Sequence, residues 1–192
     1  MNIRPYGDRA LLLDCDSLDE AQGWFAALDG RSEVVLGARS VLVVGDPETT
    51  RAMVRDTRPV TTTAVGSTVV EIPVKYDGDD LVEVSRLVGL TADEVVSAHT
   101  GSTWTVGFGG FAPGFFYLVG GDPRLHVPRR DTPRTRVPPG SVGLAGEFSG
   151  VYPRESPGGW QLIGRTDMTM WDTSREQPAP LAPGATVRFV IA

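Results

Sequence analysis

A chain of 192 residues with 41% apolar content can bury one large hydrophobic core or two smaller ones. Its net charge of −6 argues against nucleic-acid binding, because affinity for a phosphate backbone depends on basic surface. The sequence has no long apolar run and no basic leader segment, so we expect a cytoplasmic protein that does not enter a membrane. A single cysteine, Cys15, excludes an internal disulfide and a multi-cysteine metal site.

The first 75 residues alternate between strand-like and helix-like segments. We expect strands at 9–14, 33–36, 40–44 and 68–74, and helices at 17–28 and 46–56. Ser17 is a suitable helix N-cap, and Asp46-Pro47 is a typical helix start. The resulting order predicts a ferredoxin-like βαββαβ domain over residues 1–75.

The second half of the chain is rich in turn-forming residues. Two short helices are expected at 80–88 and 91–98, the second opened by Thr91 and Glu94 in a capping-box arrangement. From Gly101 onward the chain carries 15 of its 23 glycines and 11 of its 15 prolines. Strand-like runs lie at 103–106, 115–119, 142–144, 161–163 and 186–191. This pattern predicts a closed or sandwiched barrel, and therefore an α+β protein overall.

Three long motifs in this half carry a resemblance to a known family. They are Phe-Ala-Pro-Gly-Phe-Phe-Tyr-Leu at 111–118, Pro-Arg-Arg-x-x-Pro-Arg-x-x-Val-Pro-x-Gly-Ser-Val at 128–142, and Val-Tyr-Pro-x-x-Ser-Pro-Gly-Gly-Trp-x-Leu-Ile-Gly-Arg-Thr at 151–166. The chain resembles allophanate hydrolase subunit 1, a family that also includes the B subunit of bacterial 5-oxoprolinase, the KipI kinase inhibitor and half of the urea carboxylase carboxyltransferase domain. The resemblance implies a cyclophilin-like β-barrel domain at 76–192, which begins with the two short helices.

An arginine-rich loop is the first candidate site. Five arginines lie between Arg124 and Arg136, and interleaved prolines lower the entropy lost when such a loop is ordered. Guanidinium groups bind carboxylate or phosphate bidentately, so Arg129, Arg130 and Arg134 are candidate anion ligands. The alternative is a solvated basic loop.

Two residues are candidates for catalysis. His99 ends the second short helix, where a neutral imidazole can act as a general base, and the resemblance implies a histidine at this place. The alternative is a helix-capping role. Tyr117 is the second candidate, although a tyrosine between apolar neighbours also suits a core position. The two histidines do not have zinc-ligand spacing, so no metal site is expected.

A serine and a glycine pair complete the expected binding residues. The amides of Gly158 and Gly159 could bind developing negative charge, although such a pair also suits a tight hairpin. Ser141 lies in the second family motif and is a further candidate for substrate or anion binding. It lacks the Gly-x-Ser-x-Gly pattern of a serine hydrolase nucleophile.

The only lysine is Lys75, so a lysine-containing phosphate loop cannot form, and ATP would be shared with or bound by a partner. The resemblance implies a non-autonomous subunit of an ATP-dependent amide or lactam hydrolase, which acts on a small amide or lactam. Its partner would be a larger subunit of the allophanate hydrolase subunit 2 type, in a heterodimer or heterotetramer. Inhibition of a sensor histidine kinase, as by KipI, is the alternative, and prolyl isomerase activity is a weaker one.

Overall fold

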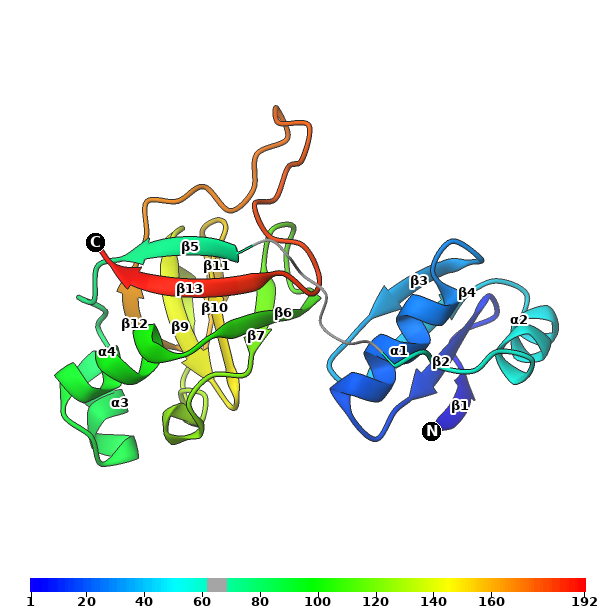
Figure 1. Ribbon diagram of the computed structural model, residues 1–192, viewed down its shortest axis with the longest axis horizontal. Helices are drawn as coiled ribbons and strands as arrows, with labels where there is room; N and C mark the ends of the chain where they lie inside the picture. The colour runs from blue at the N-terminus through cyan, green and yellow to red at the C-terminus, as the bar shows by residue number, and fades with distance from the viewer. Residues whose placement is uncertain (62–68) are drawn as a thin grey trace. The chain divides into compact units, whose positions relative to one another are not determined.

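The computed structural model describes residues 1–61 and 69–192, and the chain divides into two compact units, 1–65 and 66–192 (Figure 1). Each unit has its own sheet and its own helices. The α+β class is therefore confirmed. In the described part of the chain, no helix is long and apolar enough to cross a membrane.

The first unit is a four-stranded antiparallel sheet with two helices. Its elements are β1 (Asn2–Pro5), β2 (Ala10–Asp14), α1 (Leu18–Leu28), β3 (Glu33–Leu36), β4 (Ser40–Val44) and α2 (Pro47–Arg55). The strand order is β1-β2-β4-β3. Both helices begin as the sequence predicts: the Ser17 side chain accepts a hydrogen bond from the Glu20 amide, and Asp46 accepts one from the Thr49 amide.

One part of the predicted βαββαβ arrangement is wrong. The expected last strand, here β5 (Val69–Val74), pairs in parallel with β13 (Thr186–Ile191) in the second unit. Ile72 and Val74 are fully buried in the core of that unit, so hydrophobic burial holds β5 there. One edge of the first sheet is instead β1, which was not predicted from the sequence. The domain boundary predicted at residue 75 therefore falls after β5, although β5 belongs to the second unit.

The second unit is built on a seven-stranded, barrel-like sheet. Its other elements are α3 (Leu81–Val88), α4 (Ala92–Gly101), β6 (Trp104–Gly109), β7 (Phe116–Val119), the 3-10 turn η1 (Pro123–Leu125), β8 (Arg134–Val137), β9 (Ser141–Ala145), β10 (Phe148–Val151), β11 (Ser156–Gly158) and β12 (Gln161–Arg165). The strand order is β12-β9-β10-β7-β6-β13-β5. Lys75, directly after β5, exchanges two backbone hydrogen bonds with Arg165 on β12, which nearly closes the sheet.

Two apolar clusters fill this unit. The larger lies inside the barrel, where Trp104, Leu118 and Phe189 are buried and where α3 and α4 add Val84 and Val95. The smaller is aromatic and includes Phe115 and Trp160. The sequence predicted the barrel, both helices and the long strands, but not β8, β10 and β11.

Candidate functional site

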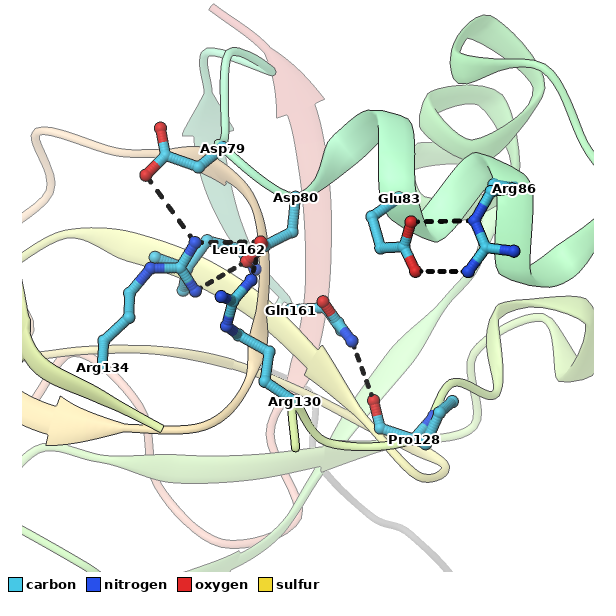
Figure 2. Close-up of polar contacts among 9 residues, drawn as sticks. All are labelled: Asp79, Asp80, Glu83, Arg86, Pro128, Arg130, Arg134, Gln161 and Leu162. Atoms are coloured by element: carbon cyan, nitrogen blue, oxygen red, sulfur yellow. Dashed lines mark hydrogen bonds and ion pairs between the residues drawn. The ribbon is translucent and has the colours of Figure 1, made fainter. Parts of the chain in front are cut away.

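A buried carboxylate joins the arginine loop to the start of α3. Asp80 precedes α3, and its side chain is 4% exposed. Arg130 donates to it at 2.5 Å, and the two terminal nitrogens of Arg134 lie 2.8 and 2.9 Å from its oxygens (Figure 2). The Leu162 amide on β12 donates a further hydrogen bond at 2.7 Å. Asp80 thus ties three separate segments of the chain together.

The electrostatics of this cluster favour the ionised carboxylate. Burial alone would raise the pKa of Asp80, but hydrogen bonds from Arg134 and the Leu162 amide, with the nearby positive charges, hold that pKa below its usual value. The same contact raises the pKa of Arg134. Asp80 makes no capping bond to its own helix, because its carboxylate is turned toward the arginines. Arg130 and Arg134 are therefore bound to a group of this chain.

The predicted glycine pair lies beside these arginines. Gly159 accepts a 2.8 Å hydrogen bond from the Arg130 amide through its carbonyl, and Gly158 pairs with Arg134 between β11 and β8. A Cβ atom on Gly158 would clash with the Tyr152 hydroxyl oxygen. The pair thus gives close packing and a carbonyl acceptor to the arginine loop, whereas its amides were expected to bind an anion.

A surface pocket of about 420 Å³ borders this cluster. Its lining residues are Glu83, Arg86, Leu87, Pro128, Arg129, Arg130, Asp131, Thr132 and Gln161. Arg129 is exposed, and no ion pair found among the described residues involves it. Glu83 and Arg86 pair with each other on α3. Of the three arginines predicted to bind an anion, Arg129 and Arg130 line this pocket, and Arg130 and Arg134 are paired with Asp80.

Gln161 forms the inner wall of the pocket. It is 4% exposed, and its side-chain nitrogen donates to the Pro128 carbonyl at 3.2 Å (Figure 2). Its carbonyl oxygen, Oε1, is buried and has no hydrogen-bond partner. A buried acceptor without a donor is costly, and this one belongs to a residue that lines the pocket.

His99 lies in the barrel core and not at the pocket. It is fully buried and stacks on Phe189 at a centroid distance of 4.2 Å. Its Nδ1 is 2.7 Å from the Tyr76 hydroxyl, and its Nε2 is 2.9 Å from the Ser149 hydroxyl. Burial lowers the pKa of His99 to about 3, so the ring is neutral at pH 7. This enclosed position suits a structural role and does not support the proton transfer expected from the sequence.

Tyr117 and Ser141 also are not among the residues that line the arginine pocket. Tyr117 stacks on Phe108 at 4.3 Å and meets Phe148 and Trp160 edge to face, so it belongs to the aromatic cluster. Ser141 is buried at the start of β9 and lines a different, smaller pocket of about 220 Å³. The structure thus brings Arg129, Arg130, Arg134 and the glycine pair together, whereas the other three candidates do not line the arginine pocket.

Two residues of this site were not predicted from the sequence. Asp80 has the sequence context of an ordinary helix N-cap, and Gln161 that of a strand residue. Their partners lie far away in the chain, as for Asp80 and Arg130, which are 50 positions apart. A polar residue at the first position of a buried strand is the only local signal that Gln161 offers. In the part of the chain that the structure describes, no group of three His, Cys, Asp or Glu side chains is placed to hold a metal ion.

Comparison with known proteins identifies the family. The chain belongs to the family described as carboxyltransferase domain, subdomain C and D, whose model matches residues 1–181. It is 48% identical over 124 residues to the B subunit of 5-oxoprolinase from Escherichia coli O157:H7, an alignment that covers 63% of this chain and 57% of that protein. The match to the B subunit of 5-oxoprolinase from Bacillus subtilis (strain 168) is 44% identical over 129 residues and covers 66% and 54% of the two chains.

The fold also has a counterpart among solved structures. The crystal structure of PH0987 from Pyrococcus horikoshii matches with a TM-score of 0.64 and 33% identity, over 100% of this chain and 97% of that chain. The matched regions cover only a little over half the length of the two 5-oxoprolinase subunits.

Proposed function

We propose that this chain acts as a non-autonomous subunit of an ATP-dependent hydrolase of amides or lactams, of the 5-oxoprolinase type. The observation that carries the proposal is the 48% identity to the B subunit of a 5-oxoprolinase, over 124 residues. At such identity the backbone of the matched region is expected to be shared. Fold alone would not support an activity, because one fold hosts many functions.

In this proposal the chain supplies binding surface, and a larger partner subunit supplies the reaction with ATP. The pocket does not fit a triphosphate, which needs several free cationic or amide donors. Arg130 is paired with Asp80 and Arg86 with Glu83, which leaves Arg129 to meet an external anion. Lys75, the only lysine, pairs with Asp77 at another pocket. One free guanidinium suits a single carboxylate.

The proposal is tested by reconstitution. The chain is coexpressed with a larger protein of the allophanate hydrolase subunit 2 type, and hydrolysis of 5-oxoproline is measured as glutamate and phosphate formed together. Each protein alone, the complex without ATP, and the complex with allophanate or urea are the controls. We expect turnover that needs both proteins and ATP and that is specific for the lactam.

Three outcomes would refute this function. Size-exclusion chromatography that leaves the two proteins as separate species would remove the subunit interpretation. A stable complex that consumes ATP without forming glutamate would exclude 5-oxoproline as the substrate. Turnover of urea or allophanate in place of 5-oxoproline would show that the complex acts on a different substrate.

A further inference from the structure

The loop between β6 and β7 holds an aromatic residue in a strained conformation (Figure 1). Phe111 has a φ of 67°, and in the described part of the chain it is the one residue other than glycine with a positive φ. Bulky side chains rarely adopt this backbone conformation, because it brings Cβ too close to the backbone. Phe111 is also 55% exposed. Neither a relaxed backbone nor full burial therefore explains a phenylalanine at this position.

The loop that carries Phe111 is fixed in place. The Gly110 amide donates a hydrogen bond to the Phe115 carbonyl at 3.2 Å. A Cβ atom on Gly114 would lie 2.7 Å from the Met170 carbonyl oxygen, so the loop packs directly on that segment. The Phe111 ring lies edge to face against the buried Phe115 ring, with the centroids 5.3 Å apart. The exposed ring is therefore ordered before any partner binds, which lowers the entropy cost of burying it in an interface.

Positive charge lies beside this ring, on the far side of Tyr152. The rings of Phe111 and Tyr152 meet edge to face at a centroid distance of 6.0 Å. Burial raises the pKa of Tyr152, and the positive charges of Arg129 and Arg134 are close enough to oppose that increase. Arg154, two residues after Tyr152, is exposed like Arg129, and neither has an ion pair within the described ranges. An apolar anchor with free positive charge nearby thus forms on a chain whose net charge is −6.

This combination is typical of the centre of a protein interface. Aromatic residues and arginines are enriched among the residues that contribute most to binding, and rigid aromatic anchors fill pockets of the partner. A second copy of the chain fits poorly, because a two-fold pairing through this surface would bring the same arginines together. A different protein that is acidic around an apolar pocket matches both the ring and the charges.

We propose that Phe111, with Arg129 and Arg154 beside it, is the docking surface for the larger partner subunit. The partner presents an apolar pocket that takes the Phe111 ring and carboxylates that pair with the two arginines. We call these three residues the Phe111 surface. The proposal rests on the proposed function, since it names the surface through which that partner is bound.

The first experiment measures the dissociation constant of the chain and a larger protein of the allophanate hydrolase subunit 2 type by surface plasmon resonance. Phe111→Asn removes the ring but fits the positive φ, and it should weaken binding by about thirtyfold or more. Phe111→Tyr keeps the ring and should bind within about threefold of wild type. The matched control is Tyr6→Asn, at an aromatic residue of the first unit that is 59% exposed, which should change affinity less than about twofold.

The isolated chain separates docking from a structural role. The urea midpoint of the barrel transition should be unchanged or higher in Phe111→Asn, because the ring is half exposed and the strain is relieved. A structural role requires the opposite result, in which the midpoint falls and the affinity for the larger protein stays that of wild type.

The second experiment tests the charges. Arg129→Gln combined with Arg154→Gln should slow association about fivefold at low salt, and the difference from wild type should shrink as salt is added. Arg51→Gln combined with Arg55→Gln, at two arginines of α2, is the matched control and should leave the association rate within about twofold. An equal change in the two double variants would show that only net charge matters and would overturn the arginine contacts.

The outcomes distinguish this proposal from the proposed function. Wild-type affinity in Phe111→Asn would overturn the Phe111 surface, and so would self-association of the wild-type chain that Phe111→Asn abolishes. If the complex hydrolyses 5-oxoproline and the Phe111 and arginine variants bind as wild type does, the function stands and the surface falls. If these variants lose binding as described but the complex hydrolyses no substrate, the surface stands and the function falls. If the wild-type chain does not bind the larger protein, this proposal and the subunit interpretation fall together.

Discussion

Asp80→Asn should destabilise the barrel unit by about 3 kcal/mol, because it removes the negative partner of two arginines. The Asp80 carboxylate is 4% exposed and receives bonds from Arg130, Arg134 and the Leu162 amide. An asparagine retains one acceptor oxygen and leaves both guanidinium groups without their anion. Removal of one partner from a buried ion pair typically costs about 3–5 kcal/mol. We take the lower value since Arg130 and Arg134 keep 35% and 19% of their side-chain surface in solvent.

The assay is equilibrium unfolding in urea, followed by circular dichroism and tryptophan fluorescence. Trp104 and Trp160 report on the barrel unit and Trp24 on the first unit, so two transitions can be fitted separately. The shift should be confined to the barrel transition. Asp79→Asn is the control, because Asp79 is 80% exposed and 3.7 Å from Arg134, and it should cost less than about 0.5 kcal/mol.

Acid provides an independent measurement of the same contact. A carboxyl whose folded pKa is lowered adds stability above its unfolded pKa, near 3.9, and loses it as the pH falls through the folded pKa. The wild-type barrel should therefore lose stability below about pH 4 more steeply than Asp80→Asn does. The reasoning would be refuted if Asp80→Asn and Asp79→Asn unfolded at the same urea concentration, or if the two acid profiles were parallel.

Three further predictions concern the stability of the barrel unit. The pKa of His99 is about 3 in the folded chain, so the unfolded chain binds more protons than the folded chain below pH 6.5. The free energy of unfolding of the barrel should therefore fall by about 2 kcal/mol between pH 7 and pH 5. The same dependence on pH in His99→Gln would contradict this. Gly78→Ala should cost about 1–3 kcal/mol because its Cβ would clash with backbone atoms of β12, whereas Gly101→Ala, with open space around it, should be near neutral in the same urea titration. Thr91→Ala should lower the barrel's stability by about 1 kcal/mol through loss of the α4 capping box, and a loss below about 0.3 kcal/mol would show that the cap is dispensable.

The sequence predicted those features that depend on neighbours in the chain. Helix starts at Ser17, Asp46 and Thr91 follow from the hydrogen-bonding capacity of single side chains, and the structure contains all three caps. Strands with regular apolar patterns were found as well. The edge strand β1 was missed because four residues with polar and proline character carry little pattern.

Long-range pairing was the part that local reasoning could not supply. β5 has a strand-like sequence, but its partner β13 lies at the other end of the chain, and the supersecondary pattern alone favoured the wrong sheet. The candidate site shows the same limit. Proline and arginine spacing located the loop at 128–134, yet Asp80 and Gln161, which contact the loop, come from other segments.

The Asp80 cluster changes the net charge that the arginine-rich loop presents to a ligand. Three adjacent free guanidinium groups would favour a polyanion, but Asp80 neutralises part of that charge and fixes Arg130 and Arg134 in place. Arg129 then meets solvent from a loop that is already ordered, which lowers the entropy cost of binding an anion. The buried Asp80 carboxylate therefore neutralises part of the charge of the loop, and among the described residues Arg129 is the arginine of this loop without an ion pair.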